Sequence, residues 1–415
     1  RIQSLGNKTT LEKAFTPNLD KLAEFGVSGR VVTVREDIAP ESDVAVTALL
    51  GFDPFQHHTG RGPLESIGCR AHYTDGDIAF RANFATVNED ASKVVDRRVG
   101  RVLTTVQGRK LSDEMNSAVK LSHSFEFVHS IEHRGILIIR PDGKKLSSNV
   151  SNTDPAYERI QGLGVIASNP TDDLSECKPL DDSKEAKQTA ELVNNFSKQA
   201  FAVLNSSPTN SQRLEEGLPK ANYVLLRDAG EKLPKFPEKM KRKNWIGIAG
   251  MPLEIALSEL CGMSVRTFTY PEIQKGEKVY DNLFKKLQTE IDNAKKVIKE
   301  NSGTAKGFYV HFKPVDICGH DGNVEQKIRM IELLDKEFFS WIVKEIDLQK
   351  NRVLVTADHA TPCELKNHSS DLVPILIAGR GVKADSEKTF FELNNGRLGV
   401  IKGIQAMQLF DKKEL

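Results

Sequence analysis

From Asn222 onward, short apolar runs alternate with longer segments of helical periodicity. The apolar runs are NYVLLRDAG, GFYVHF and RVLVTADH, and the helical segments are PLEIALSELCGM, VYDNLFKKLQTEIDNAKKVIKE and KIRMIELLDKEFFSWIVKEI. Alternation of this kind is typical of a mostly parallel sheet flanked by helices. The N-terminal region begins the same pattern, because NLDKLAEFGVSG has helical spacing and Val31–Val34 has the composition of a buried strand. We therefore predict an α/β fold.

The pattern is interrupted between Gly60 and Ser151. Segments such as DIAFRANFATV, FEFVHSIEH and RGILIIRP predict strands linked by charged turns, and a polar stretch from Ser168 to Gln188 predicts a boundary loop. A chain of 415 residues also exceeds the usual size of one hydrophobic core. We predict one domain made of residues 1–55 and 195–415, and a smaller inserted α+β domain of residues 56–194.

Charge and cysteine usage indicate an ordinary cytoplasmic protein. Lys and Arg total 58 against 57 Asp and Glu, which gives no reason to expect nucleic acid or a membrane surface as a partner. The five cysteines are widely spaced and never form a CxxC pair, so we expect a reducing compartment. No apolar run approaches the roughly 20 residues that span a bilayer, and the first residues lack the apolar core of a secretory signal.

Metal-ligating side chains follow two of the predicted strands. The run Val353–Val355 leads to Asp358 and His359, with His368 in the next loop, while FYVHF leads to Asp316 and His320. Open α/β sheets place their sites at the carboxyl ends of strands, and carboxylate and imidazole suit Zn, Mn and similar ions. A pair of such ions can clamp both oxygens of a phosphoryl displacement. The alternative is that each pair is incidental, as a loop cap or as surface polarity.

Ser42 precedes the apolar helical run of APESDVAVTALLGFDP, which Gly51 ends. A serine in this place is commonly an N-cap. The functional alternative is that a helix N-terminus presents free N–H groups to a phosphate, while a metal ionises the hydroxyl.

Arginines are concentrated in the predicted insert. Guanidinium groups match carboxylate and phosphate oxygens bidentately. The stretch DRRVGR could equally be a solvated face, and GRG around Arg61 could be only a turn.

In the order of its motifs, the chain resembles the archaeal-type 2,3-bisphosphoglycerate-independent phosphoglycerate mutases of the alkaline phosphatase superfamily. The resemblance covers most of the chain and is carried by LGNKTTLEKAFTPNLDKLAEFG, PESDVAVTALLGFDP, TGRGPLESIG, DIAFRANFATV, DRRVGR, HRGILII, SNTDP, ANYVLLRDAG, VDICGHDGN and TADHATPCELKNHSSDLVPILIAG.

This resemblance implies an alkaline-phosphatase-like sheet that carries two divalent metal ions, Mn, Zn, Co or Mg, and no use of 2,3-bisphosphoglycerate. By the resemblance, Asp316, His320 and His368 hold one metal, and Ser42, Asp358 and His359 hold the other. Ser42 is then the nucleophile that carries a phosphoserine while 3-phosphoglycerate and 2-phosphoglycerate interconvert. The residues expected to bind this small-molecule substrate are Arg61, Arg81, Asp96, Arg97, Arg98, Arg101, Arg134 and Lys313.

The chain departs from the family pattern in two places. A further carboxylate ligand, in an Asp-Gly turn after the family's first strand, would lie upstream of LGNKT, and we expect that the sequence has lost its start. At Val46 many relatives are expected to have His. These departures leave open a catalytically impaired homologue with a regulatory or assembly role, and the insert leaves open another phosphatase or phosphomutase. A homo-oligomer is compatible with the sequence.

Overall fold

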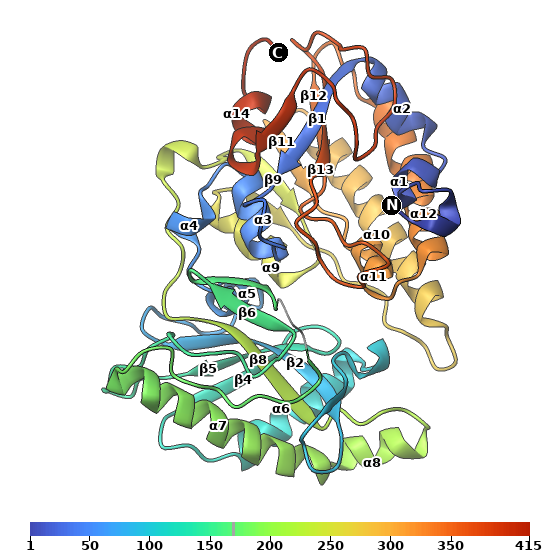
Figure 1. Cartoon of the computed structure of the whole chain (residues 1–415). Coiled ribbons are helices and arrows are strands. Elements are labelled where there is room, and N and C mark those ends of the chain that lie inside the picture. The colour runs from blue at the N-terminus through green and yellow to red at the C-terminus, as the bar shows by residue number, and fades with distance from the viewer. Residues whose placement is uncertain (168–170) are drawn as a thin grey trace.

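The computed structural model describes residues 1–167 and 171–415, which form two lobes (Figure 1). The upper lobe contains the N-terminal segment and everything after the loop that follows residue 230, and the lower lobe contains residues 61–230. The short helix α4 (Pro54–His57) lies on the connection between them. In the described part of the chain, no helix is long and apolar enough to cross a membrane.

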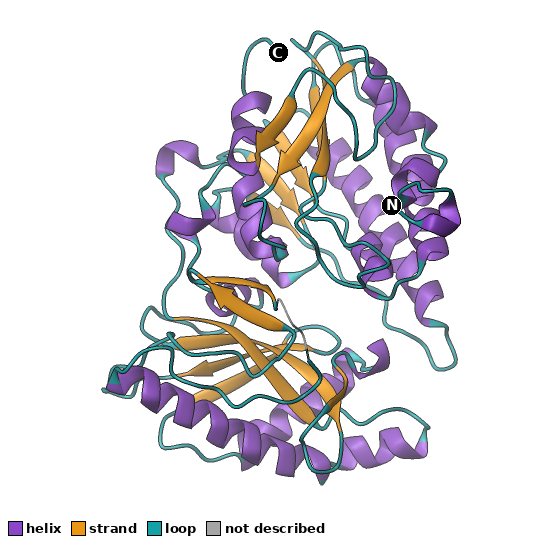
Figure 2. Cartoon of the chain, viewed as in Figure 1, coloured by secondary structure: helices purple, strands orange, loops and turns teal. Residues whose placement is uncertain are grey.

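The upper lobe contains two sheets with helices around them (Figure 2). The four-stranded sheet has the order β12 (Arg352–Thr356), β13 (Val373–Gly379), β1 (Gly26–Val32) and β14 (Gly399–Lys402). The three-stranded sheet has the order β10 (Ser264–Arg266), β9 (Trp245–Ile248) and β11 (Gly307–Val310). The helices are α1 (Thr10–Lys13), α2 (Pro17–Glu24), α3 (Ser42–Leu49), α9 (Pro252–Leu260), α10 (Val279–Asn301), α11 (Pro314–His320), α12 (Val324–Leu333), α13 (Ser340–Glu345) and α14 (Ala406–Phe410).

Strand direction differs from the prediction in this lobe. The pairs of β9 with β10 and β11 and of β1 with β14 are parallel, but β13 is antiparallel to both β12 and β1. The reason is that β12 and β13 are joined without a helix, and such a connection returns the chain in the opposite direction. The described strands therefore do not form the single mostly parallel sheet that we predicted, although one apolar core joins both sheets through Ile246, Ile248 and Leu376.

The lower lobe is built on an antiparallel sheet of β2 (Ile78–Val87), β3 (Val94–Asp96), β4 (Phe125–His129), β5 (Arg134–Ile139) and β8 (Tyr223–Gly230). Its other elements are the hairpin of β6 (Tyr157–Ile160) and β7 (Leu163–Ile166), and the helices α5 (Arg61–Gly68), α6 (Thr105–Ala118), α7 (Lys184–Asn205) and α8 (Pro208–Glu215). Phe80, Phe84, Phe127 and Phe196 anchor its core.

The lower lobe extends beyond the predicted end of the insert. We placed that end at residue 194, but α7 spans this position and β8 pairs with β2 over residues such as Ala82 and Leu226. A cut at 194 would remove a neighbour of β2, so we propose that the inserted domain extends to Gly230. Of the predicted boundary loop, residues 168–170 lie outside the described residues, and its end is already helical in α7.

Candidate active site

A helix and a loop bring the predicted metal-ligating side chains together. Asp358 and His359 follow β12, whereas Asp316 and His320 lie on α11, just beyond β11. His368 stacks on His359 with ring centroids 3.6 Å apart, and its Nε2 lies 3.7 Å from Asp316 Oδ1. Ligand atoms of Asp316, His359 and His368 all lie within 4.8 Å of one another. The closest set therefore contains His359. The resemblance instead places Asp316 with His320 and His368 at one metal, and His359 at the other.

The hydrogen bonds around the imidazoles fix which nitrogen faces the centre. His368 Nδ1 lies 2.8 Å from the carbonyl of Pro40, and His320 Nδ1 lies 3.2 Å from the carbonyl of Lys366. A carbonyl only accepts, so both Nδ1 atoms carry the proton and Nε2 keeps the lone pair. His320 Nε2 lies 3.6 Å from Asp316 Oδ1. Such carbonyl-bound imidazoles are the usual arrangement of metal ligands.

Buried polar atoms without hydrogen bonds mark the same place. Asp358 Oδ2 and His368 Nε2 are buried and have no hydrogen-bond partner. The Thr361 hydroxyl donates to Asp316 Oδ1 at 2.7 Å and lies 3.2 Å from His359 Nδ1, so it orients two members of the group. Unsatisfied buried acceptors are costly, and a divalent cation would satisfy them. The residues present therefore fit a metal site.

The electrostatics of the group favour the metal-binding forms of its members. Burial lowers the pKa of His320 to about 3 and that of His368 to about 4, so both rings are neutral near pH 7. Burial would raise the pKa of Asp316, but Lys313 and His320 outweigh burial and hold that pKa well below its usual range. The carboxylate is therefore charged when the imidazoles are neutral.

Ser42 is the first residue of α3, and its side chain is buried. The N-cap position belongs to Glu41, which makes no capping hydrogen bond, so Ser42 is not the N-cap that its sequence context suggested. Ser42 Oγ lies 3.1 Å from His359 Nε2 and accepts a hydrogen bond from Lys313 Nζ at 3.3 Å. The hydroxyl thus faces the imidazole and carboxylate group at a helix N-terminus.

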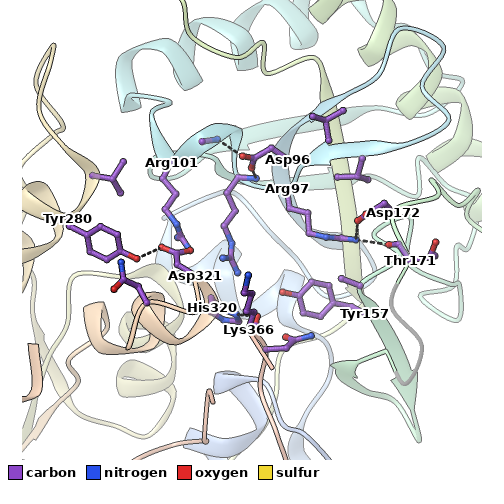
Figure 3. A pocket seen from close by; sticks show the side chains of 18 residues that line it. Asp96, Arg97, Arg101, Tyr157, Thr171, Asp172, Tyr280, His320, Asp321 and Lys366 are labelled. Atoms are coloured by element: carbon purple, nitrogen blue, oxygen red, sulfur yellow. Dashed lines mark hydrogen bonds and ion pairs between the residues drawn. The ribbon is translucent and has the colours of Figure 1, made fainter. Parts of the chain in front are cut away.

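An inner cavity of about 70 Å³ joins this group to the arginines of the lower lobe. From the upper lobe it is lined by Ser42, Lys313, Asp316, His320 and His368, and its predicted arginines are Arg61, Arg81, Arg98, Arg101 and Arg134. A larger outer cavity of about 850 Å³ opens beside it between the lobes (Figure 3). Arg98, Arg101 and His320 line both cavities.

Asp96 and Arg97 line the outer cavity but not the inner one. Arg97 pairs with Asp154 and donates to the carbonyl of Thr171 at 2.9 Å. The Asp96 carboxylate accepts from backbone N–H groups of its own loop. These side chains are thus engaged within the lower lobe, as Figure 3 shows for Arg97.

Sequence reasoning missed the acidic partners of the arginines. Glu65 Oε1 accepts from Arg61 Nε at 2.6 Å, and Glu65 Oε2 accepts from Arg81 at 2.5 Å. Glu41 accepts from Arg61 at 2.5 Å and lies 3.1 Å from Arg227. Burial would raise the pKa of Glu65, but Arg81 and Arg61 lower it, whereas burial lowers the pKa of Arg81 to about 9.

Arg227 is another residue that we missed. Its guanidinium lies 3.6 Å from the ring centroid of Tyr157, and both residues line the inner cavity. A signal was present, since Arg227 interrupts the apolar run of NYVLLRDAG, where a charged residue needs a buried partner. Val46, in contrast, packs with Leu50 and Phe52 in an apolar cluster, so its side chain belongs to the core.

Comparisons with known proteins agree on one family. A family profile described as 2,3-bisphosphoglycerate-independent phosphoglycerate mutase matches residues 23–210. The enzyme of that name from Aeropyrum pernix is 37% identical over 408 residues, covering 95% of this chain and 92% of the relative. A relative from Archaeoglobus fulgidus, 2,3-bisphosphoglycerate-independent phosphoglycerate mutase 1, is 36% identical over 98% of this chain and 93% of its own.

Solved structures are similar as well. A protein of Pyrococcus horikoshii superposes with a TM-score of 0.71 at 28% identity, over 98% of this chain and 92% of that one. The cofactor-independent phosphoglycerate mutase of Thermoplasma acidophilum superposes with a TM-score of 0.53 at 26% identity, over 98% of this chain and 94% of that one.

Proposed function

This chain belongs to the 2,3-bisphosphoglycerate-independent phosphoglycerate mutases, and we propose that it interconverts 3-phosphoglycerate and 2-phosphoglycerate through a phosphoserine on Ser42. The observation that carries the proposal is one cavity that joins a buried serine, a cation-binding group and several guanidiniums. We also propose that the upper lobe has the alkaline-phosphatase-like arrangement, with its site at the ends of β11 and β12. A cytoplasmic location is proposed from the five unpaired cysteines.

The proposed metal ligands are Asp316, His320 and His368 for one ion, and Ser42, Asp358 and His359 for the other. Divalent cations bound there would neutralise phosphoryl oxygens and lower the pKa of the serine hydroxyl. The donor set of carboxylates and imidazoles suits Mn, Zn, Co or Mg.

In the first transfer, Ser42 Oγ forms a bond to phosphorus as the bond to the 3-oxygen of the substrate breaks. In net terms the serine proton ends on the released 3-hydroxyl of glycerate. Lys313 Nζ, which donates to Ser42 Oγ at 3.3 Å, holds the nucleophile and presents a positive charge to the phosphoryl group. The backbone N–H groups at the start of α3 add further donors.

The second transfer requires glycerate to stay bound while it turns. Its carboxylate matches the guanidiniums of Arg98, Arg101 and Arg134, which line the same inner cavity as Ser42. The 2-hydroxyl oxygen then attacks the phosphoserine, the serine recovers a proton, and 2-phosphoglycerate leaves. Ion pairing between the lobes, such as Arg101 with Asp321 at 2.9 Å, keeps the cavity closed while the phosphoserine persists.

The test is turnover of 3-phosphoglycerate with Mn²⁺ and without added bisphosphoglycerate. Ser42→Ala should lower the rate on the order of 10⁴-fold or more and abolish incorporation of labelled phosphate into the protein. Ser66→Ala is a matched control, because Ser66 is equally buried and its hydroxyl only donates to the carbonyl of Gly62. Undiminished turnover in Ser42→Ala would refute the proposal, and release of inorganic phosphate without 2-phosphoglycerate would indicate a phosphatase instead.

A further inference from the structure

Three consecutive residues of the arginine-bearing loop have left-handed backbone conformations. The φ angles are 53° at Val99, 63° at Gly100 and 58° at Arg101. A β-branched residue such as valine is a genuine outlier in this region, and such backbone persists only where its surroundings hold it. The run follows Arg98 and contains Arg101, both of which line the inner and outer cavities. Its conformation therefore decides where two guanidiniums point.

The N-terminal side of the run is held by two contacts. The Val99 side chain is fully buried in the core of the lower lobe. Asp96 accepts from Arg98 N at 2.7 Å and from Gly100 N at 3.0 Å, so both carboxylate oxygens are used by the backbone of the loop. Asp96 is thus placed to hold the loop, which differs from the substrate contact that we predicted for it.

The C-terminal side is held by Arg213 of α8, a residue outside the predicted site. Its Nη1 donates to the carbonyl of Val102 at 3.2 Å and to Gln107 Oε1 at 2.5 Å, and its Nε donates to the carbonyl of Pro219 at 3.0 Å. Gln107 Oε1 also accepts from Thr104 N at 3.3 Å, in the capping box of α6. One guanidinium therefore connects α8 to the end of the loop and to the first turn of α6.

Arg213 is unusual because, among the described residues, no acid lies within ion-pairing distance of its buried charge, and Glu216 acts on it only from further away. The side chain is fully buried, it makes no ion pair with any residue the structure describes, and its Nη2 has no hydrogen-bond partner. Burial lowers its pKa to about 10. A buried cation held only by neutral acceptors destabilises a fold relative to an apolar side chain of similar size. Stability alone therefore gives no reason for an arginine at this position. The planar guanidinium group does give one, because it reaches three fixed acceptors.

We propose that Arg213 is a positioning residue that keeps the Val99–Arg101 run in its left-handed conformation, so that Arg98 and Arg101 face the phosphoglycerate. This role rests on the proposed function, since it concerns the same cavity. Arg213 does not itself line either cavity. It acts through the backbone at Val102, beside Arg101.

The test compares Arg213→Met and Arg213→Lys with the matched control Asn210→Ala. Asn210 lies on the same helix and is also fully buried, but it binds the carbonyls of Leu204 and Ala221 instead of the loop. We expect Arg213→Met to raise KM for 3-phosphoglycerate about 10- to 100-fold with a smaller change in kcat. Arg213→Lys should lie between Arg213→Met and the wild type, and Asn210→Ala should lower Tm without raising KM.

A second readout does not depend on turnover. The loop offers trypsin the bonds after Arg97, Arg98 and Arg101, and we expect cleavage there at least ten times faster in Arg213→Met than in Asn210→Ala, well below either Tm. Equal cleavage and equal KM in these two variants would overturn the proposal and reduce Arg213 to a stabilising residue. If Arg213→Met does not fold, Arg213→Lys against Asn210→Ala decides in the same way. If the wild type shows no turnover while Arg213→Met is still cleaved faster than Asn210→Ala, the proposed function is refuted. The result would still support the role of Arg213 in holding the loop.

Discussion

The two lobes bring opposite chemistry to the inner cavity. The upper lobe supplies carboxylates and imidazoles, which attract cations, from the helix α11 that follows β11 and from the loop that follows β12. The lower lobe supplies guanidiniums, which attract anions, from the interior of β2 and from the loop after β3. A phosphoglycerate between them would meet both signs of charge.

The lobes also differ in how their buried charges are compensated. Two arginines that line the inner cavity from the lower lobe share an acid of the same lobe, since Glu65 accepts from both Arg61 and Arg81. The upper lobe leaves Asp358 Oδ2 and His368 Nε2 without hydrogen bonds. The difference teaches that Arg61 and Arg81 have their partner within the chain, whereas we propose that a bound cation completes the imidazole and carboxylate group of the upper lobe. Three predictions test this contrast.

The largest effect is expected in the upper lobe. Asp316→Asn keeps the size of the side chain but removes the charge at the centre of the metal group. Mutase turnover should fall on the order of 10³-fold or more, since metal ions contribute several kcal/mol to such reactions. The metal retained after gel filtration, measured by inductively coupled plasma mass spectrometry, should fall with it.

Asp335→Asn is the control for this substitution. Asp335 is a buried acid of the same lobe, but its carboxylate binds the backbone at Asn18 and Leu19 at the start of α2. This variant should lose stability and keep its metal. Wild-type metal content in Asp316→Asn would show that the contrast between the lobes is wrong.

A stability effect is expected in the lower lobe. Glu65→Gln leaves Arg61 and Arg81 without their shared counter-ion, and breaking a buried ion pair costs about 3 kcal/mol or more in free energy of unfolding. Urea unfolding measures this loss, while metal content should not change. Glu259→Gln breaks the more exposed pair with Arg70 and should cost less than about 1 kcal/mol. Equal losses of unfolding free energy in the two variants would contradict the prediction that Glu65 compensates the buried charges of Arg61 and Arg81.

The sequence predicted the elements that have local signatures. Asp316, His320, Asp358 and His359 were proposed as metal ligands because they follow short apolar runs; the structure brings them together with His368, and metal binding by them stays a prediction. The helix that begins at Ser42 and the strands β2, β4 and β5 were confirmed for the same reason, since periodicity and glycine placement are local. The family and its activity were confirmed through motifs that run along the chain.

Features that depend on tertiary pairing were not predicted. Arg227 and Glu65 lie in sequence segments whose other residues are typical of a buried core. Their charges are explained only by ion-pair partners that are distant in sequence. β1 begins at Gly26, earlier than predicted, because β13 pairs with residues of low strand propensity such as Ser28 and Gly29. The role of Arg213 could not be predicted either, because its acceptors are mostly backbone carbonyls, which carry no sequence signal.

The smallest expected effect is a difference in the pH dependence of stability between two buried glutamates, Glu290 in the upper lobe and Glu65 in the lower lobe. Glu290 of the upper lobe accepts from the Tyr270 hydroxyl at 2.6 Å and from Lys313 N at 3.2 Å, and burial raises its pKa from 4.5 to about 8. Between these values the native state keeps a proton that the unfolded state has lost, so stability falls as pH rises and levels off above pH 8. Between pH 6 and pH 8 the loss should be about 2 kcal/mol, at about 1.4 kcal/mol per pH unit.

Glu290→Gln removes this titration, so its unfolding free energy relative to the wild type should improve by about 2 kcal/mol between pH 6 and pH 8 in urea unfolding. Glu65 provides the contrast, because Arg81 and Arg61 keep its pKa below the usual value and it is ionised in both states above pH 6. The difference between Glu65→Gln and the wild type should therefore not change over the same range. If Glu290→Gln tracks the wild type at every pH, the Glu290 carboxylate is ionised in the fold, and the hydrogen bonds from Tyr270 and Lys313 together with the charge of Lys313 outweigh its burial.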